Sequence, residues 1–288
     1  MERSAVRKYQ LAQLEILKFF DQKCKELGLE YYLVFGTLLG AVRHGGFIPW
    51  DADIDIAMFR DHYEKMKKYF LMQPVPELFY QHYETERNHL SPHAVLKIKG
   101  THVHFNRQSS SKYKPEYDGV YIDIFPIDNV LPDESKQLKQ SGEIAKIRRL
   151  VTLKAAPVYA AHTSAFKRMG KRIISAALAP ISFRYLYAKA DRIMQKYDDI
   201  QTEQVAILTD PHVFKKQLFP REVFGKPRTI SFENYSFMIP SDAEKFLQTR
   251  YGDYMKMPPE NERWQYLDET LKEIDYGNTN FLQSINKE

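Results

Sequence analysis

Between residues 6 and 27, apolar side chains recur every three or four positions, which is the period of one face of an α-helix. The apolar positions are Leu11, Leu14, Leu17, Phe20, Cys24 and Leu27. Gly28 follows directly, and glycine readily adopts the left-handed conformation that commonly ends a helix. The pattern predicts an amphipathic helix that ends at Gly28.

From residue 31 to about residue 130, short apolar or alternating stretches are separated by glycine, proline and acidic residues. The glycine turn at 36–40 opens a short helix, and Asp61 with Glu64 has the spacing of a capping box at the start of another. Alternation and β-branched or aromatic content predict strands at 31–35, 53–58, 78–83, 94–99 and 120–125. Strands that alternate with helices predict an α/β (α+β) fold with a mixed sheet flanked by helices.

The rest of the chain has a different pattern. Residues 133–197 are mainly helical in pattern, with breaks at Pro157 and Pro180. A hairpin at 228–238, a helix at 242–251 and a polar tail follow. We therefore expect three regions: a catalytic core (1–130), a helical accessory region (131–200) and a C-terminal segment that packs on the core (201–288).

Composition narrows the class of protein. The chain has 288 residues, of which 43% are hydrophobic, so it can bury a sizeable core. Cys24 is the single cysteine, which excludes a disulfide framework and a zinc–cysteine site. The net charge of +5 is spread along the chain rather than gathered in a basic tract, and this argues against a nucleic-acid partner.

Targeting signals are weak. No apolar run approaches the roughly 18 residues of a membrane span, and the charged start of the chain does not resemble a signal peptide. We expect a cytoplasmic protein. The basic and then apolar stretch 166–180 also allows contact with the inner face of the cell membrane, although a packed helix is the favoured interpretation.

Two acids two residues apart give the strongest chemical signal. On a strand, Asp53 and Asp55 point to the same side, while Ile54 and Ile56 mark the opposite side as core. Two adjacent carboxylates repel each other unless a cation lies between them. Mg²⁺, which prefers oxygen ligands and phosphates, is the natural occupant, and Mn²⁺ could replace it.

A third acid, Asp123, lies within the apolar stretch 120–125, where an unpaired carboxylate would be costly. It needs a metal ion or a cationic side chain as its partner. Asp128 is the nearest competitor, but because it follows Pro126 we expect it to cap a turn. Asp53, Asp55 and Asp123 are therefore the candidate catalytic and metal-binding residues.

A glycine turn directly after a strand can let a phosphate approach the backbone. Gly36 and Thr37 have this position, but a tight strand-to-helix turn uses the same residues and is favoured when they are considered alone. His44 could contact phosphate or be only a loop residue. Trp50 is more consistent with core packing than with a nucleotide platform.

Several segments together form one longer pattern: FGTLLGAVRHGGFIPWD at 35–51, the acids Asp53 and Asp55, VLKI at 95–98, 121–128, RYGDY at 250–254 and 258–259. This pattern resembles the LicD family, which includes bacterial phosphocholine transferases and is related to fukutin and fukutin-related protein within the nucleotidyltransferase superfamily. The resemblance covers nearly the whole chain and is weakest in the helical middle. One departure is Ala52, where the family usually carries another acid.

The resemblance implies transfer of phosphocholine from CDP-choline to a sugar hydroxyl of a cell-surface glycan, with release of CMP. The acceptor would be a teichoic acid or lipopolysaccharide precursor, which can be lipid-linked. Asp123 would bind metal or accept the hydroxyl proton. The residues that would bind substrate are Gly36, Thr37, Arg43, His44, Asp51, Lys97, Tyr251 and Asp253.

Two alternatives stay open at this point. The donor could be CDP-ribitol, CDP-glycerol or a nucleotide-sugar phosphate, with the same chemistry on another alcohol. The chain could also be an inactive module that binds a nucleotide or a glycan, although its three acids argue against this. His93, His102 and His104 do not form a metal set, and exposed strand positions are favoured for them.

Overall fold

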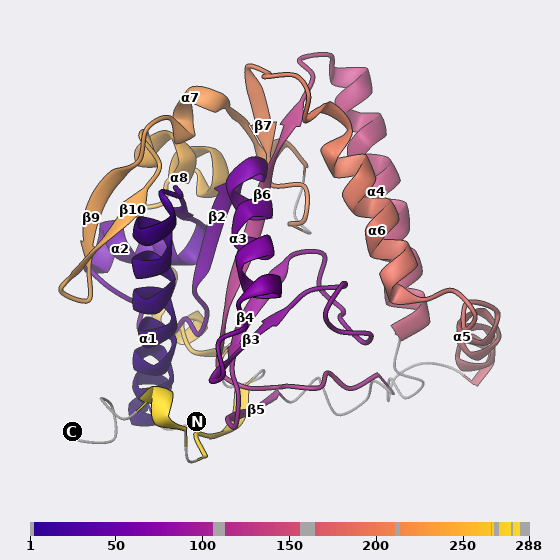
Figure 1. Ribbon diagram of the computed structural model, residues 1–288, viewed down its shortest axis with the longest axis horizontal. Coiled ribbons are helices and arrows are strands. Elements are labelled where there is room, and N and C mark those ends of the chain that lie inside the picture. Colours follow the sequence, from indigo (N-terminus) through magenta and orange to yellow (C-terminus); the bar gives the residue numbers. More distant parts are fainter. Residues whose placement is uncertain are drawn as a thin grey trace.

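A mixed sheet forms the centre of the computed structural model, which describes residues 3–105, 113–155, 165–210, 214–265, 267, 271–277 and 279–282 (Figure 1). In these residues the strand order is β1-β2-β6-β4-β3, and β7 joins β6 to β8. Strands β2 and β6 are parallel, and the other pairs are antiparallel. The strands are β1 (Tyr32–Leu33), β2 (Asp55–Phe59), β3 (Leu78–Gln81), β4 (Ala94–Ile98), β6 (Tyr121–Val130), β7 (Gln204–Ala206) and β8 (Leu218–Pro220). The expected mixed α/β architecture is confirmed.

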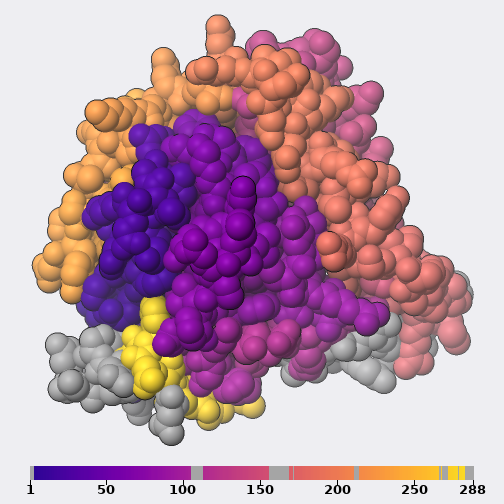
Figure 2. Space-filling model, in the orientation of Figure 1, coloured from indigo at the N-terminus to yellow at the C-terminus, as the bar shows by residue number. Residues whose placement is uncertain are grey.

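Helices cover the sheet because its strands carry apolar side chains on alternate positions. Helices α1 (Arg3–Leu27) and α3 (Arg60–Met72) lie in front of the sheet in Figure 1, and they close the face seen in Figure 2. Helix α2 (Phe35–His44) follows β1, and α8 (Ala243–Tyr251) packs against it. The core beneath these helices contains fully buried residues such as Phe20, Ile56, Leu96, Ile124 and Phe246.

The helical region forms an arm at the right of Figure 1. Helices α4 (Glu134–Ala155) and α6 (Phe183–Met194) run side by side, and α5 (Ala165–Ala177) lies at their far end. Pro180 falls between α5 and α6 as predicted, whereas Pro157 lies outside the described residues. Met169 and Ile173 on α5 are exposed, so contact with a membrane surface stays a prediction. In the described part of the chain, no helix is long and apolar enough to cross a membrane.

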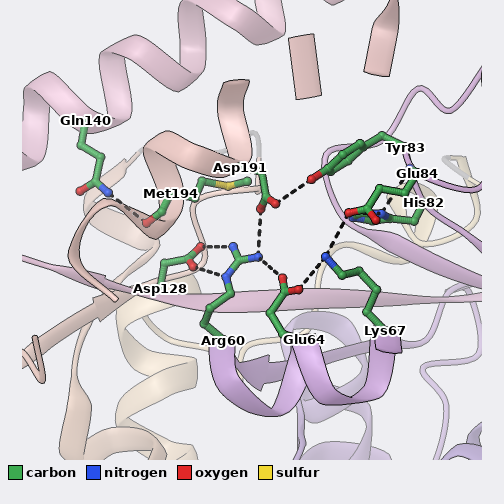
Figure 3. Close-up of polar contacts among 10 residues, drawn as sticks. All are labelled: Arg60, Glu64, Lys67, His82, Tyr83, Glu84, Asp128, Gln140, Asp191 and Met194. Atoms are coloured by element: carbon green, nitrogen blue, oxygen red, sulfur yellow. Dashed lines mark hydrogen bonds and ion pairs between the residues drawn. The ribbon is translucent and has the colours of Figure 1, made fainter. Parts of the chain in front are cut away.

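Asp128 is a buried strand residue and not a turn cap, which corrects the expectation from sequence. Strand β6 continues through Pro126 to Val130, and Asp128 accepts two hydrogen bonds from Arg60, at 2.7 and 3.0 Å (Figure 3). The same guanidinium donates to Asp191 on α6 at 3.0 Å. Tyr83 donates to the second oxygen of Asp191 at 2.8 Å. A buried carboxylate requires a charged partner, and Arg60 serves both Asp128 on β6 and Asp191 on α6. The cluster therefore joins the sheet to the helical arm.

Two other expectations need correction. Helix α3 begins at Arg60 without a side-chain cap, and Glu64 pairs with Arg60 instead of closing a capping box on Asp61. The supposed polar tail contains β11 (Leu271–Asp275), which pairs with β5 (His102–Phe105). Strand β11 forms because it pairs with a segment that is distant in the sequence, and the local pattern of residues does not predict such pairing.

Several local signals are confirmed. Gly28 follows the last helical residue with φ of 63°, as a left-handed cap requires. The hairpin consists of β9 (Arg228–Phe232) and β10 (Tyr235–Ile239). Asp242 caps α8 by accepting a hydrogen bond from the backbone of Lys245 at 2.9 Å. The other short elements in the described residues are α7 (Arg221–Phe224) and the one-turn segments η2 (Gln195–Tyr197), η3 (Phe214–Lys216), η4 (Glu260–Glu262) and η5 (Asn280–Leu282).

We predict that Arg60→Ala lowers the free energy of unfolding by about 3–5 kcal/mol, because it leaves the buried Asp128 carboxylate without its partner. Equilibrium urea unfolding measures the change. Lys65→Ala on the exposed side of the same helix is the control, and it should change stability by less than about 0.5 kcal/mol. An equal, small effect of both substitutions would contradict the structural role of the cluster.

Candidate active site

Four carboxylates gather where β2 and β6 begin. Asp55 on β2 is in parallel register with Asp123 on β6, so the two side chains stand next to each other on one face. Asp51 and Asp53 come from the connection before β2. The prediction that Asp53 lies on the strand was therefore wrong, because β2 begins at Asp55. The loop rather than the pleat brings Asp53 to the cluster.

The carboxylates raise each other's pKa. Burial and the charges of Asp51 and Asp55 hold the pKa of Asp53 well above its usual range. The pKa of Asp55 is also raised well above its usual range, by burial first and then by the charge of Asp123. Burial raises the pKa of Asp51. A protein that carries these groups unprotonated at neutral pH needs positive charge among them.

Helix α1 fixes the loop that carries two of these acids. The Gln10 amide donates to the carbonyls of Ile48 and Asp51, at 3.0 and 2.8 Å. The Gln13 amide donates to the carbonyl of Ala52 at 3.2 Å and to that of Tyr121 at 2.9 Å. Both glutamines are buried, so their bonds are shielded from water. The first helix thus positions the acid loop against β6.

The turn after β1 packs directly on the acids. The Asp55 backbone N–H donates to the Thr37 hydroxyl at 2.8 Å, so Thr37 positions a candidate metal ligand. The carboxylate of Asp51 lies where a side chain on Gly36 would project. Phe35, which opens α2, has φ of 50°, a left-handed conformation that costs a non-glycine residue energy. Gly36 and Thr37 therefore shape the acid cluster as well as the helix start.

His93 is a site residue that the sequence interpretation missed. Its Nε2 lies 3.0 Å from Oδ1 of Asp123, and its ring packs 4.2 Å from that of Phe125. The residue directly precedes β4, beside β6, and this position was a usable signal. Its contact with Asp123 was missed because His93 was grouped with His102 and His104 as a possible metal ligand. Those two are exposed on β5, as expected.

Tyr9 on α1 is a second site residue that the sequence interpretation missed, because an aromatic residue among leucines resembles a core residue. Its ring is fully buried, and among the described residues its hydroxyl has no hydrogen-bond partner. Burial, followed by the charges of Asp53 and Asp123, holds the pKa of that hydroxyl well above its usual range. Tyr9 thus places a hydrogen-bond donor near the acids.

On the β2 side, the cluster meets helix α8. Arg250 is buried, pairs with Asp210 and lies 4.5 Å above the ring of Phe35. Its charge lowers the pKa of Asp55, against the larger effects of burial and neighbouring acids. Burial is the main cause of the raised pKa of Tyr251, and the charges of Asp55 and Asp51 add to it. The structure therefore brings Tyr251 to the acids, and it adds Arg250 and Asp210, which were not singled out.

The other residues predicted to bind substrate make contacts outside the acid cluster. Arg43 donates to the carbonyl of Tyr254 at 3.0 Å, and burial lowers its pKa. His44 packs edge-on against Trp50, with 5.9 Å between ring centroids, and burial lowers its pKa. Trp50 packs against the core, as favoured from sequence. Asp253 is exposed beyond α8, and none of its described contacts reaches the acids.

Lys97 on β4 is buried, with 9% of its surface exposed. Its ammonium donates to the carbonyl of Tyr117 at 2.9 Å. Burial lowers the pKa of this ammonium to about 8, against the charge of Asp123, which raises it. Lys97 therefore carries a charge that its protein surroundings stabilise poorly.

The donor set fits a hard divalent cation. Asp51, Asp53, Asp55 and Asp123 supply only carboxylate oxygens, the ligands that Mg²⁺ and Mn²⁺ prefer. In the described ranges, no group of three acidic, histidine or cysteine side chains already surrounds a single point. The mutual elevation of the pKa values of Asp53 and Asp55 is the observation that favours a cation there.

We predict that Gly36→Ala lowers the free energy of unfolding by about 1–3 kcal/mol, because the new methyl group meets the Asp51 carboxylate. The matched control is Gly142→Ala in α4, where nothing lies within 4 Å of the added carbon. That change should be neutral or stabilise by up to about 1 kcal/mol. Thermal and urea unfolding compare the two. Similar behaviour of both variants would show that Gly36 and Asp51 are not in tight contact.

The chain is similar to known proteins over the stretch that carries these residues. The family described as "LicD/FKTN/FKRP, nucleotidyltransferase domain" matches residues 28–146, which include all four acids, His93 and Lys97. Lipopolysaccharide cholinephosphotransferase LicD of Haemophilus influenzae is 29% identical over 266 residues, which cover 91% of this chain and 96% of that protein. Human ribitol 5-phosphate transferase FKRP is 53% identical, but only over 32 residues, 11% of this chain and 6% of FKRP. Residues 28–146 thus carry a LicD-family nucleotidyltransferase domain, and the chain is a phosphotransferase.

Proposed function

We propose that this enzyme transfers phosphocholine from CDP-choline to a sugar hydroxyl of a cell-surface glycan and releases CMP, with Mg²⁺ as cofactor. The observation that carries the proposal is the cluster of four carboxylates at the start of β2 and β6. The full-length similarity to a lipopolysaccharide cholinephosphotransferase supports the choice of phosphocholine and of a glycan acceptor.

The chemistry needs charge neutralisation and alignment more than covalent catalysis. The sugar oxygen attacks the phosphorus that carries choline, and the bond from this phosphorus to the CMP oxygen breaks. Asp53 and Asp55, with Asp51 beside them, would hold the metal ion. When bound, that ion supplies positive charge next to the diphosphate. The two electrons of the broken bond stay on CMP, which leaves as the phosphate monoester.

Asp123 takes the proton of the attacking hydroxyl in this proposal. The contact from His93 Nε2 to Asp123 Oδ1 orients the carboxylate and can stabilise its charge. The parallel register beside Asp55 keeps this acid next to the phosphate-binding residues. Arg250 and Lys97 lie on opposite sides of the acids and add positive charge where the diphosphate would be. Tyr9 can donate a hydrogen bond to the carboxylates or to the substrate.

A second donor has an observation in its favour. The 53% identity to ribitol 5-phosphate transferase FKRP over 32 residues is higher than that to LicD, although it spans only 11% of the chain. CDP-ribitol is therefore the alternative donor, with the same bonds made and broken. A lipid-linked acceptor and contact of α5 with the inner membrane face belong to the same proposal.

Release of CMP from a panel of CDP-alcohols tests the proposal directly. With Mg²⁺ and a lipopolysaccharide or teichoic-acid acceptor, we predict that CDP-choline is turned over faster than CDP-ribitol and CDP-glycerol, and that EDTA abolishes turnover. Asp123→Asn serves as the inactive control. Faster turnover of CDP-ribitol would show that CDP-ribitol rather than CDP-choline is the donor. No turnover of any CDP-alcohol would favour a binding module.

A metal site at Asp55 would also affect the stability of the protein. We predict that Asp55→Asn stabilises the metal-free protein at pH 7 by at least about 1 kcal/mol, since it removes a repelling charge. The folded pKa of Asp55 is raised, so wild-type stability falls as pH rises from its ordinary value of 3.8 through the folded value. The advantage of the variant therefore disappears at low pH.

Millimolar Mg²⁺ should make the wild type more stable than Asp55→Asn at pH 7, because only the wild type binds the ion tightly enough to gain stability. Lys99→Met is the control for general salt effects. Thermal unfolding at several pH values, with and without Mg²⁺, measures both changes. A destabilised Asp55→Asn variant in EDTA, or an equal response of both proteins to Mg²⁺, would contradict a metal site there.

A further inference from the structure

A cavity of about 500 Å³ lies beside the acid cluster and is not explained by the acids themselves. Gln81 on β3 and Lys97 on β4 line it from the sheet, and Asn88, Ser91 and Tyr113 line it from the loops. His104 on β5 also contributes to its wall. The cavity thus lies over the β3 and β4 side of the sheet, opposite the side where Arg250 meets Asp55.

Strand register links this cavity to the reacting groups. Lys97 pairs with Tyr121, and Asp123 lies two residues further along β6 and pairs with Val95. Lys97 and Asp123 are therefore diagonal neighbours on the same face of the sheet, a separation of about 7–8 Å. A ligand in the cavity with its phosphate at Lys97 would reach the acids without leaving the protein surface.

Lys97 requires an anion. Its ammonium is buried, and its hydrogen bond goes to the carbonyl of Tyr117. Among the described residues, no carboxylate forms an ion pair with it. The carboxylates of Asp123, Glu86 and Asp118 act on this buried ammonium only from a distance, and a phosphate oxygen in the cavity would place a counter-charge in direct contact with it.

The charge of the cavity excludes the cationic part of the donor. Three lysines line it, against the carboxylates of Asp118 and Glu273. The carboxylate of Asp118 already has a partner, since Nδ1 of His102 lies 2.6 Å from its Oδ1. The positively charged choline group would therefore be repelled there, whereas a phosphate monoester would be attracted.

We infer that this cavity binds the nucleoside monophosphate part of the donor, with its phosphate at Lys97 and its base beside Tyr113. The inference rests on the proposed CDP-linked donor. Tyr113 offers an aromatic ring of the kind on which bases stack. The side-chain amides of Gln81 and Asn88 lie in the same wall and offer hydrogen-bonding groups. A volume of about 500 Å³ lies in the range of small-molecule sites and suits a nucleoside monophosphate.

Binding of CMP to the full-length protein tests this without turnover. We measure the dissociation constant by isothermal titration calorimetry in the presence of Mg²⁺. Lys97→Met removes the charge at nearly constant volume, and Ser91→Trp fills the cavity. Each should weaken CMP binding at least tenfold. The matched controls, Lys99→Met directly after the same strand and Ser91→Ala, should bind CMP within twofold of wild type.

Thermal unfolding of each variant verifies folding, and if Lys97→Met does not fold, Ser91→Trp with Ser91→Ala carries the test. Unchanged CMP affinity in Lys97→Met and Ser91→Trp would overturn the inference. An acceptor KM that rises in Ser91→Trp while CMP affinity is unchanged would do so too, and would assign the cavity to the glycan. Specific CMP binding without turnover of any CDP-alcohol would keep the cavity assignment and reject the proposed reaction, so the two can fail separately.

Discussion

Repulsion among four carboxylates held at the start of two parallel strands is the constraint on which the site depends. Asp55 and Asp123 cannot separate, because the register of β2 and β6 fixes them side by side. Asp51 and Asp53 cannot withdraw easily, because Gln10 and Gln13 bind the loop that carries them. The fold therefore holds an unfavourable interaction that a bound divalent cation would relieve. Stability is lost here in exchange for a site organised before the substrate arrives.

The rest of the molecule supports this constraint from three directions. Helix α1 fixes the acid loop, the turn at Gly36 and Thr37 packs against Asp51 and Asp55, and α8 adds the charge of Arg250. Away from the acids, a buried pairing of Arg60 with Asp128 and Asp191 joins the sheet to the helical arm. The two charge clusters differ in their balance: Arg60 donates to both acids of the second, whereas in the first the charge of Arg250 is outweighed at Asp55 by burial and the neighbouring carboxylates.

Local patterns in the sequence predicted the elements whose formation is decided locally. The cap at Gly28, the hairpin at β9 and β10 and the acid-bearing strands follow from periodicity and turn chemistry. Strands β7, β8 and β11 were missed because each is short and is formed by pairing with a distant segment. Asp128 was misjudged because its partner, Arg60, is 68 residues away. His93 and Tyr9 escaped notice for the same reason, since a lone side chain shows its role only through its three-dimensional neighbours.

The central claim is that these carboxylates are held in mutual repulsion until a divalent cation binds. Carbon-detected NMR titration of the aspartate carboxyl groups, assigned through single Asp→Asn variants, measures this most directly. Without divalent metal, at least one of Asp53 and Asp55 should titrate well above the ordinary aspartate value of 3.8. Saturating Mg²⁺ should return these pKa values to or below that value, because the cation favours the ionised form. Ordinary pKa values in the metal-free protein, unchanged by Mg²⁺, would contradict the account.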